Sequence, residues 1–167
     1  MPTLATSIEH QNLVDLAIRW LKRQGFSVIA SELNCHGSRE IPDVYACRET
    51  CSAIVEVKVS RSDFLADAKK PERTQGGLGN YRLYLCPAEL IQVSDIPPGW
   101  GLLYAYGKKI EVKHFAMGNM WPNERHLTEN WGPFFHPSNL SLERAALFSI
   151  ARRLSVRKSE ISCSGKK

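Results

Sequence analysis

The chain has 167 residues, a formal net charge of +5, and 43% hydrophobic and 23% charged residues. This length allows one domain with a substantial core, and the composition is that of an ordinary globular protein rather than a disordered or fibrous chain. No apolar run approaches transmembrane length, the N-terminus lacks the regions of a signal peptide, and the five cysteines are scattered singly rather than set out as a disulfide framework. We therefore expect a reducing, cytoplasmic setting and no membrane partner.

The positive charge is confined to the C-terminal end of the chain. Residues 1–140 hold equal numbers of basic and acidic side chains, whereas the basic excess of +5 lies entirely in residues 141–167. A basic end of this kind suits contact with phosphates, and it suits a solvated tail equally well.

The first expected element is an amphipathic helix over residues 7–24. Leu13, Leu16 and Trp20 recur at helical spacing on one face, and Glu9 begins that face. A first-turn Glu is also favoured by the helix dipole, so Glu9 has an ordinary structural explanation. A strand is expected next, over residues 26–33, and its Glu32 is either an exposed strand-end residue or a further carboxylate near a site.

The chain is organised around the stretch from Ser38 to Lys70. Within it, an apolar strand over residues 53–59 is interrupted by two charges, Glu56 and Lys58. Burying an unpaired charge is costly, so two of them in a buried-looking strand indicate a specific use. Strand residues two apart point to the same side, and Glu56 and Lys58 therefore share one face.

A hairpin places a third polar side chain beside these two. If residues 41–47 pair with the strand at 53–59 through a turn centred near Glu49, Asp43 lies opposite Glu56. Directly opposed side chains lie about 5 Å apart at Cβ, which is close enough for two carboxylates to share a metal ion. A longer loop centred on the same point leaves this pairing intact. In the same register, Lys58 faces Ile41.

Two carboxylates and a lysine on one face suggest phosphate chemistry. Hard oxygen ligands suit Mg²⁺ or Mn²⁺, which take the rest of their shell from water and substrate phosphates. A neighbouring lysine can orient a water or neutralise charge that develops on a phosphate. A solvated cross-strand ion pair is the structural alternative.

These residues resemble a known nuclease motif. IPD at 41–43 followed by EVK at 56–58 is similar to the signature of the PD-(D/E)XK nuclease superfamily. The pattern continues through VSRSDFLADAKKP at 59–71 and GNYRLYLCP at 79–87, and the fuller pattern resembles small bacterial and phage-borne proteins that include MmcB-like DNA-repair proteins. The resemblance covers about residues 7–115, and residues 116–167 do not match it.

The resemblance implies an α/β fold with a restriction-endonuclease-like core in the order αβββαβ, a mixed central sheet flanked by helices, and an added C-terminal helix. It implies a metal-dependent nuclease that hydrolyses DNA, or RNA, with Mg²⁺ or Mn²⁺ as cofactor. Because nothing in the sequence resembles a base-reading module, we expect selectivity for structure or strand type rather than for sequence. Asp43 and Glu56 would be metal ligands and Lys58 the catalytic lysine. Because related nucleases often add a glutamate from the first helix, Glu9 is a further candidate ligand, together with the Val57 carbonyl.

A helix is expected over residues 60–70, with Ser60 or Ser62 as its N-cap and Pro71 as its end. Basic side chains follow the start of this helix and gather near its end. Cations at a helix end are usually solvated, and only the neighbouring acid–lysine motif suggests that these bind nucleic acid. The residues expected to contact phosphates are Arg61, Lys69, Lys70, Arg73 and Arg82.

The rest of the chain completes the expected domain. A strand over 81–87 should run parallel to an earlier one, and a hairpin should turn around Gly107. The Pro- and aromatic-rich residues 116–139 are expected to wrap the core at 1–115, or else to offer stacking platforms for bases. A last helix over 141–154, with Leu147, Ile150 and Leu154 spaced for burial, should pack on the same domain. The basic tail at 155–167 is expected to be disordered.

Two other metal sites and two other function classes remain as alternatives. Zinc-type ligands are present without a CxxC motif at Cys35, His36, Cys47 and Cys51. A superficial likeness to a His-Asn-His nuclease involves His114, His126, Asn130 and His136. The competing functions are a catalytically silent nucleic-acid-binding or regulatory protein on the same fold, and a protein-interaction module.

Overall fold

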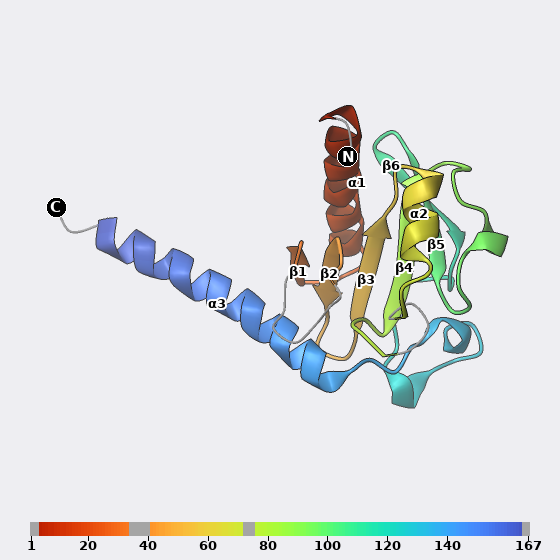
Figure 1. The fold of residues 1–167 in the computed structure, drawn as a ribbon. Helices are drawn as coiled ribbons and strands as arrows, with labels where there is room; N and C mark the ends of the chain where they lie inside the picture. Colours follow the sequence, from red (N-terminus) through yellow and green to blue (C-terminus); the bar gives the residue numbers. More distant parts are fainter. Residues whose placement is uncertain (1–3, 34–40, 72–75, 165–167) are drawn as a thin grey trace.

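The computed structural model describes residues 4–33, 41–71 and 76–164, which form an α/β fold (Figure 1). The first six elements follow the order αβββαβ, and a strand hairpin and a long C-terminal helix follow them. This confirms the expected fold class. The helices and strands are α1 (Leu4–Arg23), β1 (Val28–Ser31), β2 (Val44–Cys47), β3 (Ser52–Val57), α2 (Arg61–Asp67), β4 (Tyr81–Pro87), β5 (Gly101–Tyr106), β6 (Lys109–His114) and α3 (Leu140–Ser164).

The strands form one mixed six-stranded sheet in the order β1-β2-β3-β4-β5-β6. The pairs β1–β2, β2–β3 and β5–β6 are antiparallel, and β3–β4 and β4–β5 are parallel. The helix α2 makes the crossover between the parallel strands β3 and β4, as a parallel pair requires. The expected parallel placement of residues 81–87 is confirmed.

The β2–β3 hairpin has the predicted register. Val44 pairs with Val55 and Cys47 pairs with Ser52, so the next position outward sets Asp43 opposite Glu56. The strands are shorter than expected because β2 begins at Val44 and β3 ends at Val57. Asp43 and Lys58 therefore lie one residue beyond the strand ends, Asp43 before β2 and Lys58 after β3.

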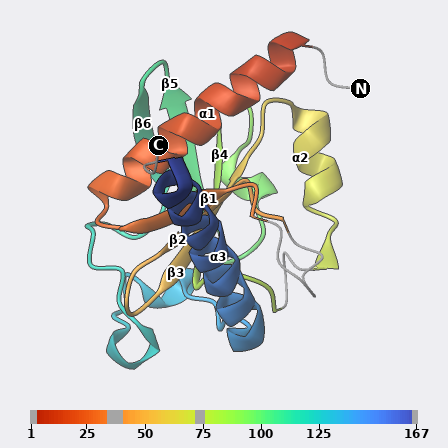
Figure 2. The same ribbon diagram turned by 90° about the vertical axis from the view of Figure 1, so that its left-hand side faces the viewer.

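The two faces of the sheet carry separate apolar cores. On one face, Leu13, Leu16 and Trp20 of α1 pack with residues of β2, β3 and β4, which confirms the apolar face expected for this helix. On the other face, Phe64 of α2 packs with a second cluster that includes Tyr84 of β4. The sheet is thus covered by α1 on one side and by α2 on the other (Figure 2).

The aromatic segment after β6 is part of the core. Trp121 and Trp131 are each 1% exposed, and their rings lie 5.2 Å and 5.4 Å from the ring of Tyr81. This supports the wrapping role expected for residues 116–139. Two indoles that are this well buried are not available as stacking platforms for bases.

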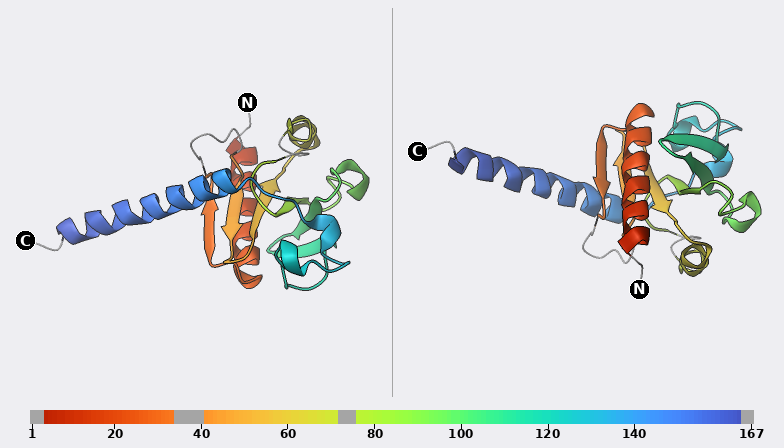
Figure 3. Two further views of the ribbon diagram at one scale, coloured as in Figure 1. Left: turned by 90° about the horizontal axis from the view of Figure 1, so that it is seen from below. Right: turned by 90° about the horizontal axis from the view of Figure 1, so that it is seen from above.

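The C-terminal helix α3 differs most from expectation. It projects away from the body and continues to Ser164, through most of the tail for which disorder was predicted (Figures 1 and 3). Ala146 and Ile150 pack against the core, whereas Leu147 is 42% exposed and Leu154 is 57% exposed. The predicted burial of Leu147 and Leu154 is therefore wrong, because the helix leaves the body after its first turns. None of the described helices is both long and apolar enough to cross a membrane.

Candidate active site at the end of β3

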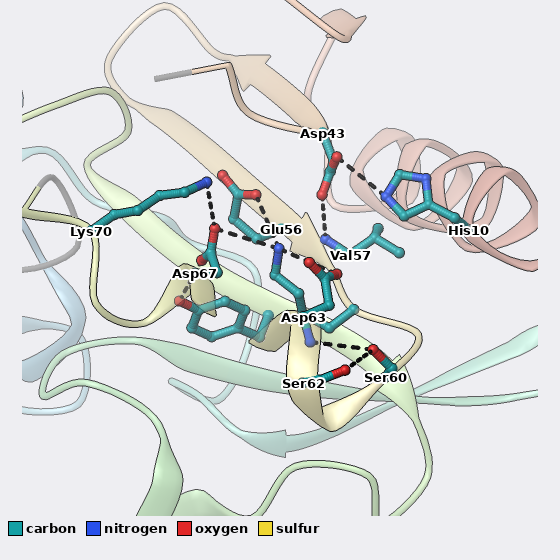
Figure 4. Close-up of polar contacts among 11 residues, drawn as sticks. His10, Asp43, Glu56, Val57, Ser60, Ser62, Asp63, Asp67 and Lys70 are labelled. Atoms are coloured by element: carbon teal, nitrogen blue, oxygen red, sulfur yellow. Dashed lines mark hydrogen bonds and ion pairs between the residues drawn. The ribbon is translucent and has the colours of Figure 1, made fainter. Parts of the chain in front are cut away.

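The predicted site residues gather where β3 ends, between α1 on one side and α2 on the other (Figure 4). Asp43 enters from the start of β2, and Glu56 and Lys58 belong to the last residues of β3 and its extension. The backbone N–H of Glu32 donates to the carbonyl of Asp43 at 3.1 Å, which fixes Asp43 between β1 and β3. Three separate chain segments thus define this end of the sheet.

Asp43 is held by both of its carboxylate oxygens. Oδ2 accepts a hydrogen bond from the backbone N–H of Val57 at 2.8 Å, and Oδ1 lies 3.3 Å from Nε2 of His10 on α1. The side chain of Asp43 is 20% exposed and that of His10 is 30% exposed. The carboxylate therefore bridges the gap between the end of β3 and the first half of α1.

The two side chains shift each other's pKa in opposite directions. The hydrogen bond to Asp43 raises the pKa of His10 above its ordinary value, against the lowering effect of burial. Burial pushes the pKa of Asp43 upward, but the hydrogen bonds from His10 and Val57 outweigh it, and the pKa lies below its ordinary value. The arrangement thus favours an imidazolium beside a carboxylate.

The first-helix residue that contacts Asp43 is His10, whereas Glu9 was the residue expected near the site. The side chain of Glu9 is exposed, and its role as a metal ligand stays a prediction. Sequence reasoning did not single out His10, since a lone histidine on an amphipathic helix is usually a surface or structural residue. Only the packing of α1 across the sheet brings it to Asp43.

Glu56 and Lys58 are buried on the side of the sheet that faces α2. Their side chains are 4% and 7% exposed, and Oε2 of Glu56 lies 4.0 Å from Nζ of Lys58. The same Nζ lies 3.8 Å from Oδ2 of Asp63 and 3.4 Å from Oδ1 of Asp67, both on α2. One buried ammonium thus has three carboxylates within 4 Å.

The local structure of α2 explains how its two acids reach Lys58. Ser60 is the N-cap, as expected, and its Oγ accepts from the N–H of Asp63 at 3.2 Å. Asp63 and Asp67 are four residues apart, so they lie on one face of the helix, beside the buried Phe64. This spacing is visible in the sequence and was the available signal for both residues.

The two predicted metal ligands have different polar partners in this conformation. Asp43 points toward His10 and the backbone of Val57, and Glu56 points toward Lys58 and α2 (Figure 4). Across the described ranges, no group of three or more His, Cys, Asp or Glu side chains is arranged to hold a metal ion. Mg²⁺ is often bound through only one or two carboxylates plus substrate phosphates, so this donor pair still suits the ion chemically.

The expected phosphate-contacting cations have varied placements. Arg61 is exposed and makes a two-point contact with Asp95, at 2.7 Å and 2.9 Å, which lowers the pKa of that carboxyl to about 2. Lys69 is exposed, and Nζ of Lys70 lies 2.9 Å from Asp67. Arg73 lies outside the described residues.

Arg82 is buried, and its role in contacting phosphates stays a prediction. Its side chain is 1% exposed, and its guanidinium donates to the carbonyl of Gly79 at 3.2 Å and also to that of Gly76. In this structure Arg82 braces the turn that leads into β4. The alternation of side chains along a strand does not show whether an arginine points into solvent or folds back onto the turn that precedes the strand.

Among the described residues, those named for the two alternative metal sites do not come together. Cys47 packs with the α2-side cluster and Cys51 with the α1-side cluster, so they occupy opposite faces of the sheet. Cys35 and His36 lie outside the described residues. The four residues named for the His-Asn-His alternative contact four different partners. His114 contacts Phe134, His126 contacts Asn123, Asn130 contacts Met117, and His136 contacts Gly99.

Comparisons with known proteins bear on the fold. No protein-family model matches the chain, and no curated protein matches it. Among solved structures, the SPO1766 protein of unknown function from Silicibacter pomeroyi is similar, with a TM-score of 0.62 and 20% sequence identity. The match covers 95% of this chain and 94% of that chain. At this identity the likeness shows a shared fold over nearly the whole length and leaves the function open.

Proposed function

We propose that the protein is a metal-dependent nuclease that hydrolyses phosphodiester bonds of DNA, selecting strand structure rather than sequence. The observation that supports this best is the β2–β3 register, which sets Asp43 opposite Glu56 with the buried Lys58 two residues further on. The order and spacing of these residues resemble the PD-(D/E)XK motif. RNA is the second substrate to test.

The oxygen donors fit a Mg²⁺ or Mn²⁺ cofactor. Asp43, Glu56 and the carbonyl of Val57 would hold the ion, and Glu9 is the further candidate. The bound ion would polarise the scissile phosphate and lower the pKa of a water. To engage it, Asp43 would exchange its present partners, His10 and the backbone N–H of Val57.

The role proposed for Lys58 follows from its charge and burial. Its Nζ lies 4.0 Å from Glu56 in a side chain that is 7% exposed, so its charge is poorly screened by water. A cation beside the reacting phosphate stabilises the negative charge that develops as the phosphorus is attacked. The exposed Lys69 is placed one helix away, where it could contact the nucleic-acid backbone.

One observation favours a second candidate, a nucleic-acid-binding or regulatory protein that does not cleave. Asp43 is already hydrogen-bonded to His10 and Val57, and Glu56 faces Lys58, so the two carboxylates are held apart. Among the described residues, no three-ligand metal group is formed. A protein that retained the fold for binding alone would have no need to bring the carboxylates together.

Cleavage assays distinguish the two candidates. Labelled single-stranded, duplex and branched DNA, and RNA, are incubated with the protein and Mg²⁺ or Mn²⁺. We expect metal-dependent cutting that is slowed by about 100-fold or more, to a low but measurable rate, in Lys58→Ala and Asp43→Asn. The exposed Lys108→Ala and Asp15→Asn variants serve as matched controls and should cut as wild type does.

The outcomes separate cleanly. Absence of cutting, with salt-sensitive nucleic-acid binding retained, would overturn the nuclease proposal in favour of the binding protein. Cutting at the wild-type rate in both Lys58→Ala and Asp43→Asn would place the activity elsewhere. Thermal unfolding of each variant shows whether a loss of activity reflects a loss of fold.

A further inference from the structure

We propose that Asp67 of α2 is a positioning residue that fixes the Lys58 ammonium beside Glu56. The functional consequence rests on the proposed nuclease activity, whereas the positioning itself can be measured without it. Lys58 follows β3 and Asp67 ends α2, so the contact joins the strand to the crossover helix.

Distance and burial single out Asp67 among the three acids around Lys58. Its Oδ1 is the nearest carboxylate oxygen, at 3.4 Å from Nζ, compared with 3.8 Å for Asp63 and 4.0 Å for Glu56. The Asp67 side chain is 2% exposed, whereas that of Asp63 is 50% exposed. Water and salt screen a buried pair far less than an exposed one, so Asp67 holds the ammonium more strongly than Asp63 does.

Asp67 is itself held in a fixed orientation. The hydroxyl of Tyr84 on β4 donates to its Oδ2 at 3.0 Å, which leaves Oδ1 directed at the two lysines. Nζ of Lys70 lies 2.9 Å from this Oδ1 and adds a second positive charge from the exposed side. A side chain fixed by its own partners can fix another, which is how polar neighbours orient functional groups.

An aromatic contact between α2 and β4 also helps to place Asp67. Phe64 is 1% exposed, and its ring lies 5.1 Å from the ring of Tyr84. The same tyrosine therefore anchors α2 through its ring and orients Asp67 through its hydroxyl. The contact between Phe64 and Tyr84 thus places the backbone of α2 so that Asp67 lies beside Lys58.

Lysine reactivity tests the positioning directly. Intact protein is treated with an amine-acylating reagent, and the modification rate at Lys58 is followed by mass spectrometry. We expect Asp67→Asn to raise the rate at Lys58 by about tenfold or more, the equilibrium equivalent of losing a charged hydrogen bond. Asp63→Asn, which removes an exposed and more distant acid, should raise it by much less.

Two further measurements separate positioning from unfolding. Tyr84→Phe keeps every charge but removes the hydroxyl that orients Asp67, so it should raise the rate at Lys58 in the same direction and by less. The thiol of Cys86 is 0% exposed and should stay protected in every variant if the fold is intact. An unchanged Lys58 rate in Asp67→Asn, or an equal rise in Asp63→Asn, would overturn the proposal.

A double-mutant cycle then measures the consequence for cleavage. If Asp67 acts only through Lys58, Asp67→Asn lowers kcat with little change in KM, and the Lys58→Ala/Asp67→Asn double variant is no slower than Lys58→Ala alone. Additive losses would mean that Asp67 acts independently of Lys58, and would contradict the proposal. If the wild-type protein does not cut, the nuclease proposal fails, and the labelling result still decides whether Asp67 positions Lys58.

Discussion

The contact between His10 and Asp43 makes the stability of the site depend on pH. The raised pKa of His10 means that its contribution is complete below the ordinary value of 6.5 and is lost as pH rises through the folded value. The lowered pKa of Asp43 means that its contribution is present above the ordinary value of 3.8 and is lost as pH falls through the folded value. The pair therefore stabilises the fold most between these two ordinary values.

A His10→Ala variant tests this window. We expect it to lose about 1 kcal/mol of unfolding free energy near pH 5.5 and much less near pH 9, where the imidazole is neutral in both states. Urea denaturation at the two pH values measures the difference. His126→Ala, at an exposed histidine hydrogen-bonded to Asn123, is the control and should show no such pH dependence. An equal loss at both pH values would mean that His10 contributes through packing alone.

Arg82 is a second residue whose substitution should change the stability of the fold. Its buried guanidinium donates to the carbonyls of Gly79 and Gly76. We expect Arg82→Ala to lower the unfolding free energy by about 2–4 kcal/mol, since buried acceptors lose charged donors. The exposed Arg125→Ala should cost less than about 0.5 kcal/mol. A near-neutral Arg82→Ala in urea denaturation would contradict the bracing role.

Whether a site residue could be predicted from the sequence depends on whether strand pairing or helix–sheet packing brings it to its partners. Asp43, Glu56 and Lys58 are related by one hairpin, so strand alternation and a turn centre were enough to bring them together. His10 and Asp67 reach the site only through helix–sheet packing. The spacing of Asp63 and Asp67 places both on one face of α2, but it does not specify what that face packs against.

The turn that leads into β4 is tightly constrained. Gly79 has φ +84°, and a Cβ placed there would lie 3.1 Å from a side-chain carbon of Ile54 and 3.2 Å from the Ile54 backbone nitrogen. Gly107 in the β5–β6 turn also has a positive φ, +59°, but nothing lies within 4 Å of its added Cβ. Comparing alanine substitutions at the two glycines therefore distinguishes the cost of a left-handed backbone from the cost of crowding by neighbouring atoms.

We expect Gly79→Ala to cost about 2–3 kcal/mol and Gly107→Ala about 1 kcal/mol, because only the first adds crowding against the core to the penalty of a left-handed backbone. Chemical denaturation of both variants measures the two losses. Equal losses would show that the neighbours of Gly79 give way at little cost.

The base of α3 is anchored to the sheet by one acid. Oε1 of Glu143 accepts from the Ser52 hydroxyl at 2.7 Å and from the Gly79 N–H at 2.9 Å, and the Tyr45 hydroxyl donates to its other oxygen. This side chain connects the projecting helix to β2, β3 and the turn before β4. The sequence predicted a helix here, but only its contacts show where it leaves the body.

Hydrogen exchange tests this anchor. We expect Glu143→Ala to speed exchange of the α3 amides over residues 145–150 by about tenfold or more, because several hydrogen bonds to a carboxylate are lost. Arg152→Ala, a change further along the helix where the side chain is exposed, should leave those amides unaffected. Fast exchange of these amides already in wild type would contradict a rigid attachment.

For the whole molecule, the α/β class, the αβββαβ order and the mixed sheet were expected from the resemblance of residues 41–58 to a nuclease motif, whereas turn centres and apolar strands predicted the β2–β3 hairpin and the parallel placement of β4. The path of α3 could not be predicted in the same way. Leu147 and Leu154 have the spacing of a buried stripe, yet both are exposed on the projecting part of the helix. Apolar periodicity indicates a helix face and does not say what covers it.

We propose that Asp43 and Glu56 hold one divalent cation at the end of β3, and Mn²⁺ binding tests this proposal. Calorimetric titration of wild type should show one Mn²⁺ site, lost in both Asp43→Asn and Glu56→Gln and retained in the exposed control Glu111→Gln. Absence of Mn²⁺ binding to wild type, or wild-type affinity in both site variants, would contradict the proposed metal site and favour a protein that binds nucleic acid without cutting it.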